Sequence, residues 1–147
     1  MSLEENKAIV RRLNEAYGTA NWDLLDDLVA PEYVDHSNQI KGVEALKQLM
    51  KVGKPAFPDW HETIEDIIAE GDKVWVLLTY TATHTGEFRG LAPTGNKMTG
   101  KAVDIYRIVN GKLAEYWNVT DKLGLFKPQC VIEYTEKGKK LFPEEVE

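Results

Sequence analysis

One predicted β-hairpin carries most of the residues that could do chemistry. Its strands flank Asn110-Gly111, a pair typical of a type I′ turn because both residues tolerate a positive φ. With a two-residue loop, alternation places three carboxyls, a phenol and an indole on one face: Asp104, Tyr106, Glu115, Trp117 and, at the far end, Asp121. This face is predicted to be the wall of a substrate pocket. A slip of one residue would move the set to the opposite face.

Asp121 is the candidate for proton transfer. A carboxyl among apolar and aromatic groups has a raised pKa because burial disfavours the anion, so it can exchange a proton near neutral pH. Asp121 ends the second strand on the face that also carries Trp117 and Val119. The alternative is a structural role, because Lys-Leu-Gly-Leu follows Asp121 and aspartate commonly caps the start of a helix. Spacing alone favours the cap.

The other carboxyls of this face have two interpretations. Asp104 and Glu115 could share a proton in the pocket. Glu115 could instead accept a hydrogen bond from the indole of Trp22 or Trp60. The tyrosine and tryptophan between them are aromatic pocket walls or ordinary core residues, which differ little in geometry.

A second predicted hairpin turns at Gly71-Asp72, and its second strand ends at His84. Its register pairs Ala69 with Val74, places Thr63 near Tyr80, and brings Asp59 towards His84. Asp59 is therefore counted with the pocket, although a strand-end contact with His84 would hold the following loop instead.

Two histidines could each donate a hydrogen bond to a substrate carbonyl or orient a carboxylate, and both are assigned to the pocket: His36 and His84. No spacing such as His-Glu-x-x-His accompanies them, so we expect neither a metal nor a cofactor. The loop 86–95, which is rich in glycine, is predicted to cover the pocket and to hinge at Gly86 and Gly90.

The remaining elements define the fold class. Apolar residues at helical spacing predict three N-terminal helices: 3–18, about 21–29 and 42–52. Runs of β-branched and aromatic residues predict the strands: 60–69, 74–84 and the two arms of the 101–121 hairpin. Helices followed by hairpins favour an α+β fold, with helices covering one face of a curved antiparallel sheet and enclosing a pocket.

Length and composition bound the remaining possibilities. The 147 residues suit a single domain, 1–147, in which about 131–147 form a peripheral tail. A net charge of −6 argues against a nucleic-acid partner. No run of the sequence suits a membrane span or a secretion signal. The lone Cys130 cannot form an intrachain disulfide, which fits a cytoplasmic location.

An ordered set of motifs between about residues 4 and 130 resembles the SnoaL-like polyketide cyclases, within the nuclear transport factor 2-like superfamily. The motifs are Phe57-Pro-Asp59, Glu70-Gly-Asp-Lys-Val74, Thr83-His-Thr-Gly-Glu-Phe-Arg-Gly-Leu-Ala-Pro-Thr-Gly95, Asp104-Ile-Tyr-Arg107, Gly111-Lys-Leu-Ala-Glu-Tyr-Trp117 and Asp121. The resemblance implies a cone-shaped α+β barrel, with a highly curved sheet around a hydrophobic pocket.

The resemblance also implies an activity. Characterised cyclases of this family close a polyketide ring by an intramolecular aldol condensation, using an acid/base aspartate that matches Asp121 and no metal. We therefore expect an enzyme of lyase or isomerase type that cyclises, isomerises or hydrolyses a small apolar carbonyl compound. The alternative is a module of the same fold that binds a small molecule without turnover.

The opposite face of the 101–121 hairpin predicts a protein partner. It is mostly apolar, and it includes Val103, Ile105 and Tyr116. Exposure of such a face would be a liability in a monomer, so we predict a homodimer or higher homo-oligomer through the outer sheet face.

Overall fold

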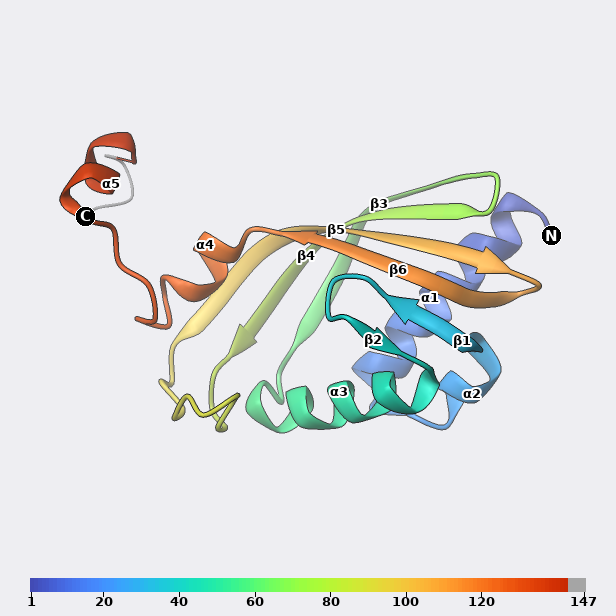
Figure 1. Cartoon of the computed structure of the whole chain (residues 1–147), viewed down its shortest axis with the longest axis horizontal. Helices are drawn as coiled ribbons and strands as arrows, with labels where there is room; N and C mark the ends of the chain where they lie inside the picture. Colours follow the sequence, from blue (N-terminus) through green and yellow to red (C-terminus); the bar gives the residue numbers. More distant parts are fainter. Residues whose placement is uncertain (143–147) are drawn as a thin grey trace.

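The computed structural model describes residues 1–142, in which the N-terminal helices pack on one side of a curved sheet (Figure 1). The helices are α1 (Leu3–Gly18), α2 (Leu24–Leu28), α3 (Val43–Ala56), α4 (Lys122–Phe126) and α5 (Glu136–Leu141). The strands are β1 (Val29–Asp35), β2 (Ile40–Lys41), β3 (His61–Glu70), β4 (Lys73–Thr83), β5 (Lys97–Val109) and β6 (Lys112–Thr120). The α+β fold and the three N-terminal helices agree with the sequence prediction.

The sheet has the strand order β2-β1-β6-β5-β4-β3 and does not close into a barrel. Each neighbouring pair is antiparallel except β1 and β6, which run parallel. The prediction of a wholly antiparallel sheet was therefore wrong for this pair, because α2 leads directly into β1 and delivers it beside the last strand.

Local sequence explains how α1 is fixed over the concave face. Ser2 and Glu5 form a capping box, in which each side chain accepts a hydrogen bond from the backbone N–H of the other residue. The buried side chains of α1 recur at helical spacing and face the sheet: Asn6, Ile9, Val10, Leu13 and Ala16. They join the inward side chains of β4 in one apolar core.

The turn of the β5–β6 hairpin forms as predicted. Asn110 and Gly111 have φ values of 49° and 76°, which suit a type I′ turn, and Val109 pairs with Lys112. The register then shifts by one residue between Arg107 and Ile108, which makes Ala114 the extra residue of a β-bulge. Beyond the bulge, the predicted pairing was wrong.

The bulge exchanges the two faces of β6. Asp104 lies opposite Asn118, and Tyr106 lies opposite Tyr116. The concave face therefore receives Tyr116 and Asn118, and the outer face receives Glu115 and Trp117.

The β3–β4 hairpin also contains a β-bulge that changes the predicted pairing. Ala69 pairs with Val74 as predicted, but a second register shift between Ile64 and Asp66 leaves Glu65 unpaired. Glu62, rather than Thr63, therefore lies opposite Tyr80 on the concave face.

The loop after β4 is fixed at its start. The N–H groups of Thr85 and Gly86 both donate to the carbonyl of Ala56, at 3.0 and 3.2 Å. A methyl group on Gly86 would overlap the Pro55 carbonyl at the end of α3. Gly86 therefore serves the close approach of two backbones, and its predicted role as a hinge stays a prediction.

The chain after β6 leaves the sheet. The α4 helix packs beside β5, whereas α5 stands apart from the sheet in Figure 1. Residues 143–147 of the predicted tail lie outside the described residues. Within residues 1–142, no helix is long and apolar enough to cross a membrane.

Candidate active site

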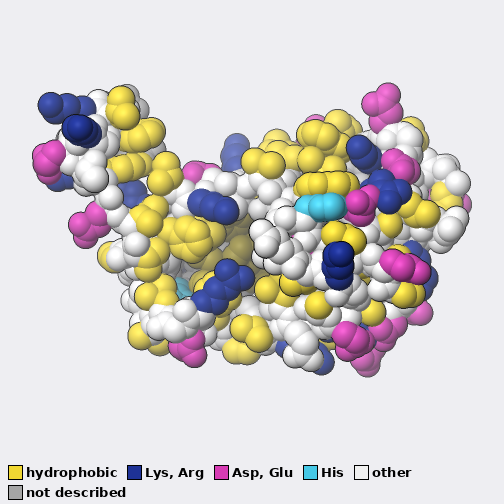
Figure 2. All heavy atoms as spheres, viewed as in Figure 1, with side chains coloured by type: hydrophobic (Ala, Val, Ile, Leu, Met, Phe, Trp, Pro, Cys, Tyr) yellow, Lys and Arg dark blue, Asp and Glu magenta, His cyan; other side chains and the backbone are white. Residues whose placement is uncertain are grey.

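The concave side of the sheet is hollowed in the view of Figure 2. The hollow lies over β4 and β5 and is bordered by α3, by α4 and by the connection between β1 and β2. The inward side chains of β4 are apolar or aromatic, and all are buried: Val74, Val76, Leu78, Tyr80 and Ala82. The interior behind the sheet is therefore largely apolar.

A buried carboxyl with three donors lies at the centre of the concave face. Asp104 is 5% exposed and accepts hydrogen bonds from the hydroxyls of Tyr106, at 3.1 Å, and Tyr116, at 3.0 Å, and from the amide of Asn118, at 2.7 Å. Burial raises the pKa of Asp104, and the three donors counteract part of that rise. The bulge in β6 is what brings Tyr116 and Asn118 to this carboxyl.

A second interior carboxyl comes from β3. The indole of Trp60 donates to Glu62 Oε1 at 2.8 Å, and the amide of Asn14 on α1 donates to Oε2 at 2.7 Å. Burial, and then the charge of Asp104, raise the pKa of Glu62 to about 7. Such a carboxyl can gain or lose a proton near neutral pH.

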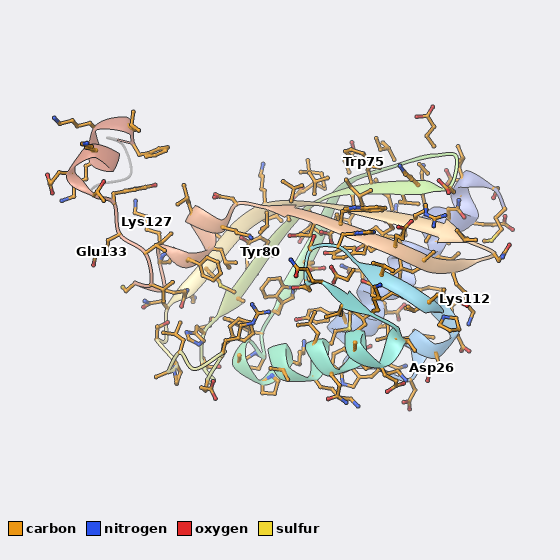
Figure 3. The ribbon with its side chains drawn as sticks, viewed as in Figure 1. Asp26, Trp75, Tyr80, Lys112, Lys127 and Glu133 are labelled. Carbon is orange, nitrogen blue, oxygen red and sulfur yellow. The ribbon has the colours of Figure 1, made fainter. Side chains whose placement is uncertain are left out.

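Aromatic rings form one wall of this interior. The rings of Trp60 and Tyr80 stack at 5.2 Å between centroids, and Tyr80 is labelled in Figure 3. Gly100 lies opposite Tyr80 across the β4–β5 pair, where a methyl group would overlap the phenol. Glycine at this position therefore lets the Tyr80 ring lie across β5.

Two buried polar atoms on β4 and just beyond it have no hydrogen-bond partner in the described part of the chain: Tyr80 Oη and His84 Nε2. The other imidazole nitrogen, His84 Nδ1, accepts from the backbone N–H of Thr94 at 3.3 Å and lies 3.2 Å from Thr94 Oγ1. A buried polar atom without a partner is costly. His84, Asp104 and Tyr106 lie on the inner side of the sheet, and their predicted part in a substrate pocket stays a prediction.

Three other predicted pocket residues lie on the outer face. His36 Nε2 and Glu115 Oε1 are 3.0 Å apart, and the His36 ring stacks on Trp117 at 4.6 Å. Arg107 also donates to Glu115, and Arg107 first and His36 second lower the Glu115 pKa. Their placement in the pocket was wrong because the β6 bulge turns Glu115 and Trp117 outward, and His36, which follows β1, contacts both of them there.

Asp59 does not pair with His84. Its carboxylate accepts hydrogen bonds from the backbone N–H and the hydroxyl of Thr83, both at 2.7 Å, and these bonds lower its pKa. The β3 bulge shifts the strand by one residue, which explains why the predicted partner was wrong. Asp59 holds the end of β4 instead.

Asp121 is the N-cap of α4. Its Oδ1 accepts a hydrogen bond from the N–H of Gly124 at 3.0 Å, and the residue is exposed. This is the structural role that spacing favours. The cap occupies one carboxylate oxygen, and the predicted role of Asp121 in proton transfer stays a prediction.

Sequence reasoning missed the residues that the bulges bring inward: Glu62, Tyr116 and Asn118. For β3 a signal was present. Ile64 and Ile67 both face inward although they are three residues apart, a spacing that breaks strand alternation and indicates an extra residue. The β6 arm offers no equally plain signal, because both of its faces carry aromatic residues.

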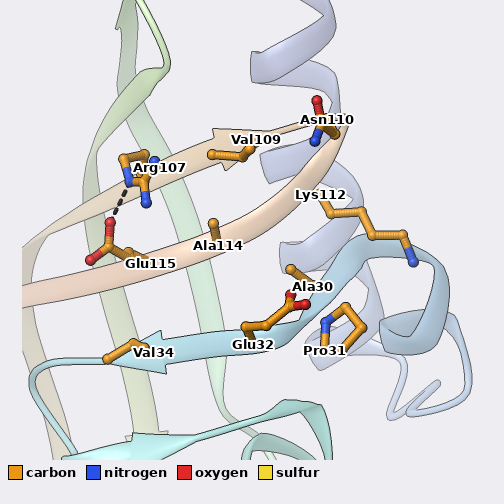
Figure 4. Close-up of a pocket in the computed structure, with 10 residues that line it drawn as sticks. All are labelled: Ala30, Pro31, Glu32, Val34, Arg107, Val109, Asn110, Lys112, Ala114 and Glu115. Atoms are coloured by element: carbon orange, nitrogen blue, oxygen red, sulfur yellow. Dashed lines mark hydrogen bonds and ion pairs between the residues drawn. The ribbon is translucent and has the colours of Figure 1, made fainter.

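A groove of about 440 Å³ lies elsewhere, between β1 and the end of the β5–β6 hairpin (Figure 4). Its lining residues are Ala30, Pro31, Glu32, Val34, Arg107, Val109, Asn110, Lys112, Ala114 and Glu115. The ion pair of Arg107 with Glu115 occupies its polar side. No three potential ligand side chains of His, Cys, Asp or Glu come together as a metal site among residues 1–142.

Comparison with known proteins gives a consistent assignment. A family model described as SnoaL-like polyketide cyclase matches residues 7–128. The aklanonic acid methyl ester cyclase DauD of Streptomyces sp. (strain C5) is 29% identical over 126 residues, which cover 81% of this chain and 78% of DauD.

Solved structures agree. AclR of Streptomyces galilaeus, whose assignment as a hydroxylase is provisional, superposes with a TM-score of 0.79 at 32% identity, covering 90% of this chain and 100% of AclR. TsrD of Streptomyces laurentii, at 22% identity, has a TM-score of 0.82 and covers 90% of this chain and 99% of its own, which supports the fold alone.

Proposed function

The chain belongs to the SnoaL-like polyketide cyclase family, and from that premise we propose that it closes a ring in a small apolar carbonyl compound by acid/base catalysis. The observation that carries the proposal is the placement on the concave side of the sheet of two carboxyls whose pKa burial raises, Asp104 and Glu62. A site with this composition can bind an apolar skeleton and exchange protons with its oxygen-bearing positions.

The reaction would be an intramolecular aldol closure. A base removes a proton from the carbon beside one carbonyl, and the resulting enolate carbon attacks a second carbonyl carbon of the same molecule. As the new carbon–carbon bond forms, the π bond of the second carbonyl breaks, and the oxygen of that carbonyl takes a proton from the acid. No oxidant or reductant is consumed.

On the basis of the family match, we propose that Asp121 exchanges the proton with the substrate. Two features support it: Asp121 is exposed where β6 passes into α4, and the helix cap occupies only Oδ1. Among the described residues, no hydrogen bond is made to Oδ2, which would then be the oxygen that exchanges the proton. A carboxyl in this role contributes about 10²–10⁴ in rate.

The experiment compares Asp121→Asn with the parent on aklanonic acid methyl ester, the compound named for the relatives. Asparagine is as good an N-cap as aspartate but cannot exchange the proton, so α4 should persist. We expect turnover to fall by about 100-fold or more. Asp23→Asn makes the same acid-to-amide change at the N-cap position of α2, where the side chain forms no capping hydrogen bond, and should leave turnover unchanged.

Two outcomes would contradict the proposal. Turnover by Asp121→Asn at the parent rate would reject the catalytic role of Asp121. Asp104→Asn and Glu62→Gln would then each be compared with the parent. Binding of the compound to the parent without any turnover would favour the module that only binds. That second function is favoured by one observation: every donor around Asp104 is already satisfied within the protein.

A further inference from the structure

The hydrogen atoms around Asp104 are all directed at its carboxylate. The hydroxyl of Tyr106 donates to Oδ2, and Oδ1 receives the hydroxyl of Tyr116 and the amide N–H of Asn118. An amide nitrogen can only donate, so the direction of the Asn118 bond is fixed. With Asp104 ionised, the two phenols donate as well.

What these side chains retain is their acceptor capacity. A hydroxyl that donates its hydrogen keeps lone pairs on oxygen, and the Asn118 carboxamide keeps Oδ1. Tyr106, Tyr116 and Asn118 are each half-buried, whereas Asp104 is 5% exposed. The residues beside Asp104 that keep some exposed surface are therefore its three partners.

We propose that Tyr106, Tyr116 and Asn118 form a subsite that accepts a hydrogen bond from a hydroxyl group of the ligand, with Asp104 as the positioning residue. The inference rests on the proposed function only for the location of the ligand, because it concerns recognition and not turnover. The subsite discriminates against an ether or a carbonyl at the same place, since an oxygen without hydrogen would face other lone pairs.

The test measures binding of two probes that cannot cyclise: 2-naphthol and 2-methoxynaphthalene. Their ring systems match, and only the naphthol has a hydroxyl hydrogen. At about pH 8 we expect the parent to bind 2-naphthol at least about tenfold more tightly, as measured by titration calorimetry, because a well-placed buried hydrogen bond is worth roughly that factor.

Asp104→Asn should bring that ratio close to one. The new carboxamide has a donor of its own, so at least one of the three surrounding donors loses its acceptor and can turn to an ether oxygen. Thermal unfolding of the variant verifies that it folds. If it does not fold, Tyr116→Phe takes its place, since it removes one acceptor and should lower the ratio at least about threefold.

Asp23→Asn, the same acid-to-amide change outside the hollow, should keep the parent ratio. Equal affinity of the parent for both probes would overturn the subsite, and so would an unchanged ratio in folded Asp104→Asn. Either result leaves the turnover test of Asp121→Asn unaffected, so a failure of recognition and a failure of catalysis are told apart.

Discussion

Among single residues, Glu62 has the plainest consequence for the dependence of stability on pH. Its pKa rises from 4.5 to about 7 on folding, chiefly because it is buried and then because Asp104 lies near. Between these two values the folded chain binds more protons than the unfolded chain, so stability falls as pH rises through this window. Above about pH 7 the loss is complete and stability stays at the lower level.

Glu62→Gln should therefore stabilise the protein at alkaline pH. The carboxamide keeps the size of the side chain and an acceptor for Trp60, and it carries no charge to bury. We expect a gain of about 1–3 kcal/mol in the free energy of unfolding at pH 8, shrinking towards zero near pH 4. Urea unfolding across this pH range measures it.

The matched control for that change is Glu65→Gln. Glu65 is the unpaired residue of the β3 bulge, and its carboxylate is exposed and accepts a hydrogen bond from Thr79. This variant should show no gain that depends on pH in the same window. A parallel rise in both variants would mean that net charge, and not burial of Glu62, sets the effect.

At the scale of elements, the two bulges decide which side chains face the concave side. Ala114 is the extra residue of β6. If it were paired regularly, opposite Arg107, Glu115 and Trp117 would take the inward positions now held by Tyr116 and Asn118. An inward Glu115 would lose Arg107 as its partner and add a charge beside Asp104. The bulge is therefore part of the construction of the site.

Deletion of Ala114 should leave the faces of β6 as they are. Leu113 and Glu115 become neighbours, so Glu115 still lies opposite Arg107 and Tyr116 stays inward. We expect the variant to fold and to lose no more than about 1–3 kcal/mol in the free energy of unfolding, as measured with urea. Insertion of an alanine between Glu115 and Tyr116 should cost more than this deletion, at least about 3 kcal/mol, because it turns Tyr116 outward and takes donors from the buried Asp104. Equal losses in the two variants would show that the length of the strand does not decide its faces.

These bulges also mark the limit of prediction from sequence. The helices, both tight turns and the pairings next to them were predictable because capping, helical spacing and Asn110-Gly111 act over a few residues. A bulge is fixed instead by contacts across the sheet and with the helices. Asp104 and Tyr106 were placed correctly because β5 is regular, and the assignments on β6 failed beyond Ala114.

At the scale of the whole molecule, the outer sheet face carries a continuous apolar area. Cross-strand pairs form one row, Ile68, Trp75, Ile105 and Trp117, and a second row, Leu77, Val103 and Val119. Ile68, Trp75 and Val119 are 59%, 46% and 66% exposed. Trp75 lies on the side of the sheet away from the helices (Figure 3), and hydrophobic side chains gather along the same edge in Figure 2.

We expect this area to be the contact surface of a homodimer. Two copies can place such faces against one another about a twofold axis, and Trp75 near the middle of the first row would be buried by its counterpart or by a neighbour of it. Trp75→Glu places a charge in that contact, where burial without a partner is strongly unfavourable. The variant should be a monomer at about 10 μM, where the parent should be a dimer, since dimers with contacts of this kind commonly dissociate only below micromolar concentration.

Sedimentation velocity distinguishes the two states, and Val52→Glu provides the control. Val52 is 57% exposed on α3, on the helical side of the molecule, so the same kind of change there should leave the dimer intact. A monomeric parent would reject the dimer through this face. If the parent and both variants are dimers, the contact lies elsewhere. Loss of the dimer in Trp75→Glu alone, with the folded circular dichroism spectrum retained, is the result that the exposed rows predict, because only the outer face has then been changed.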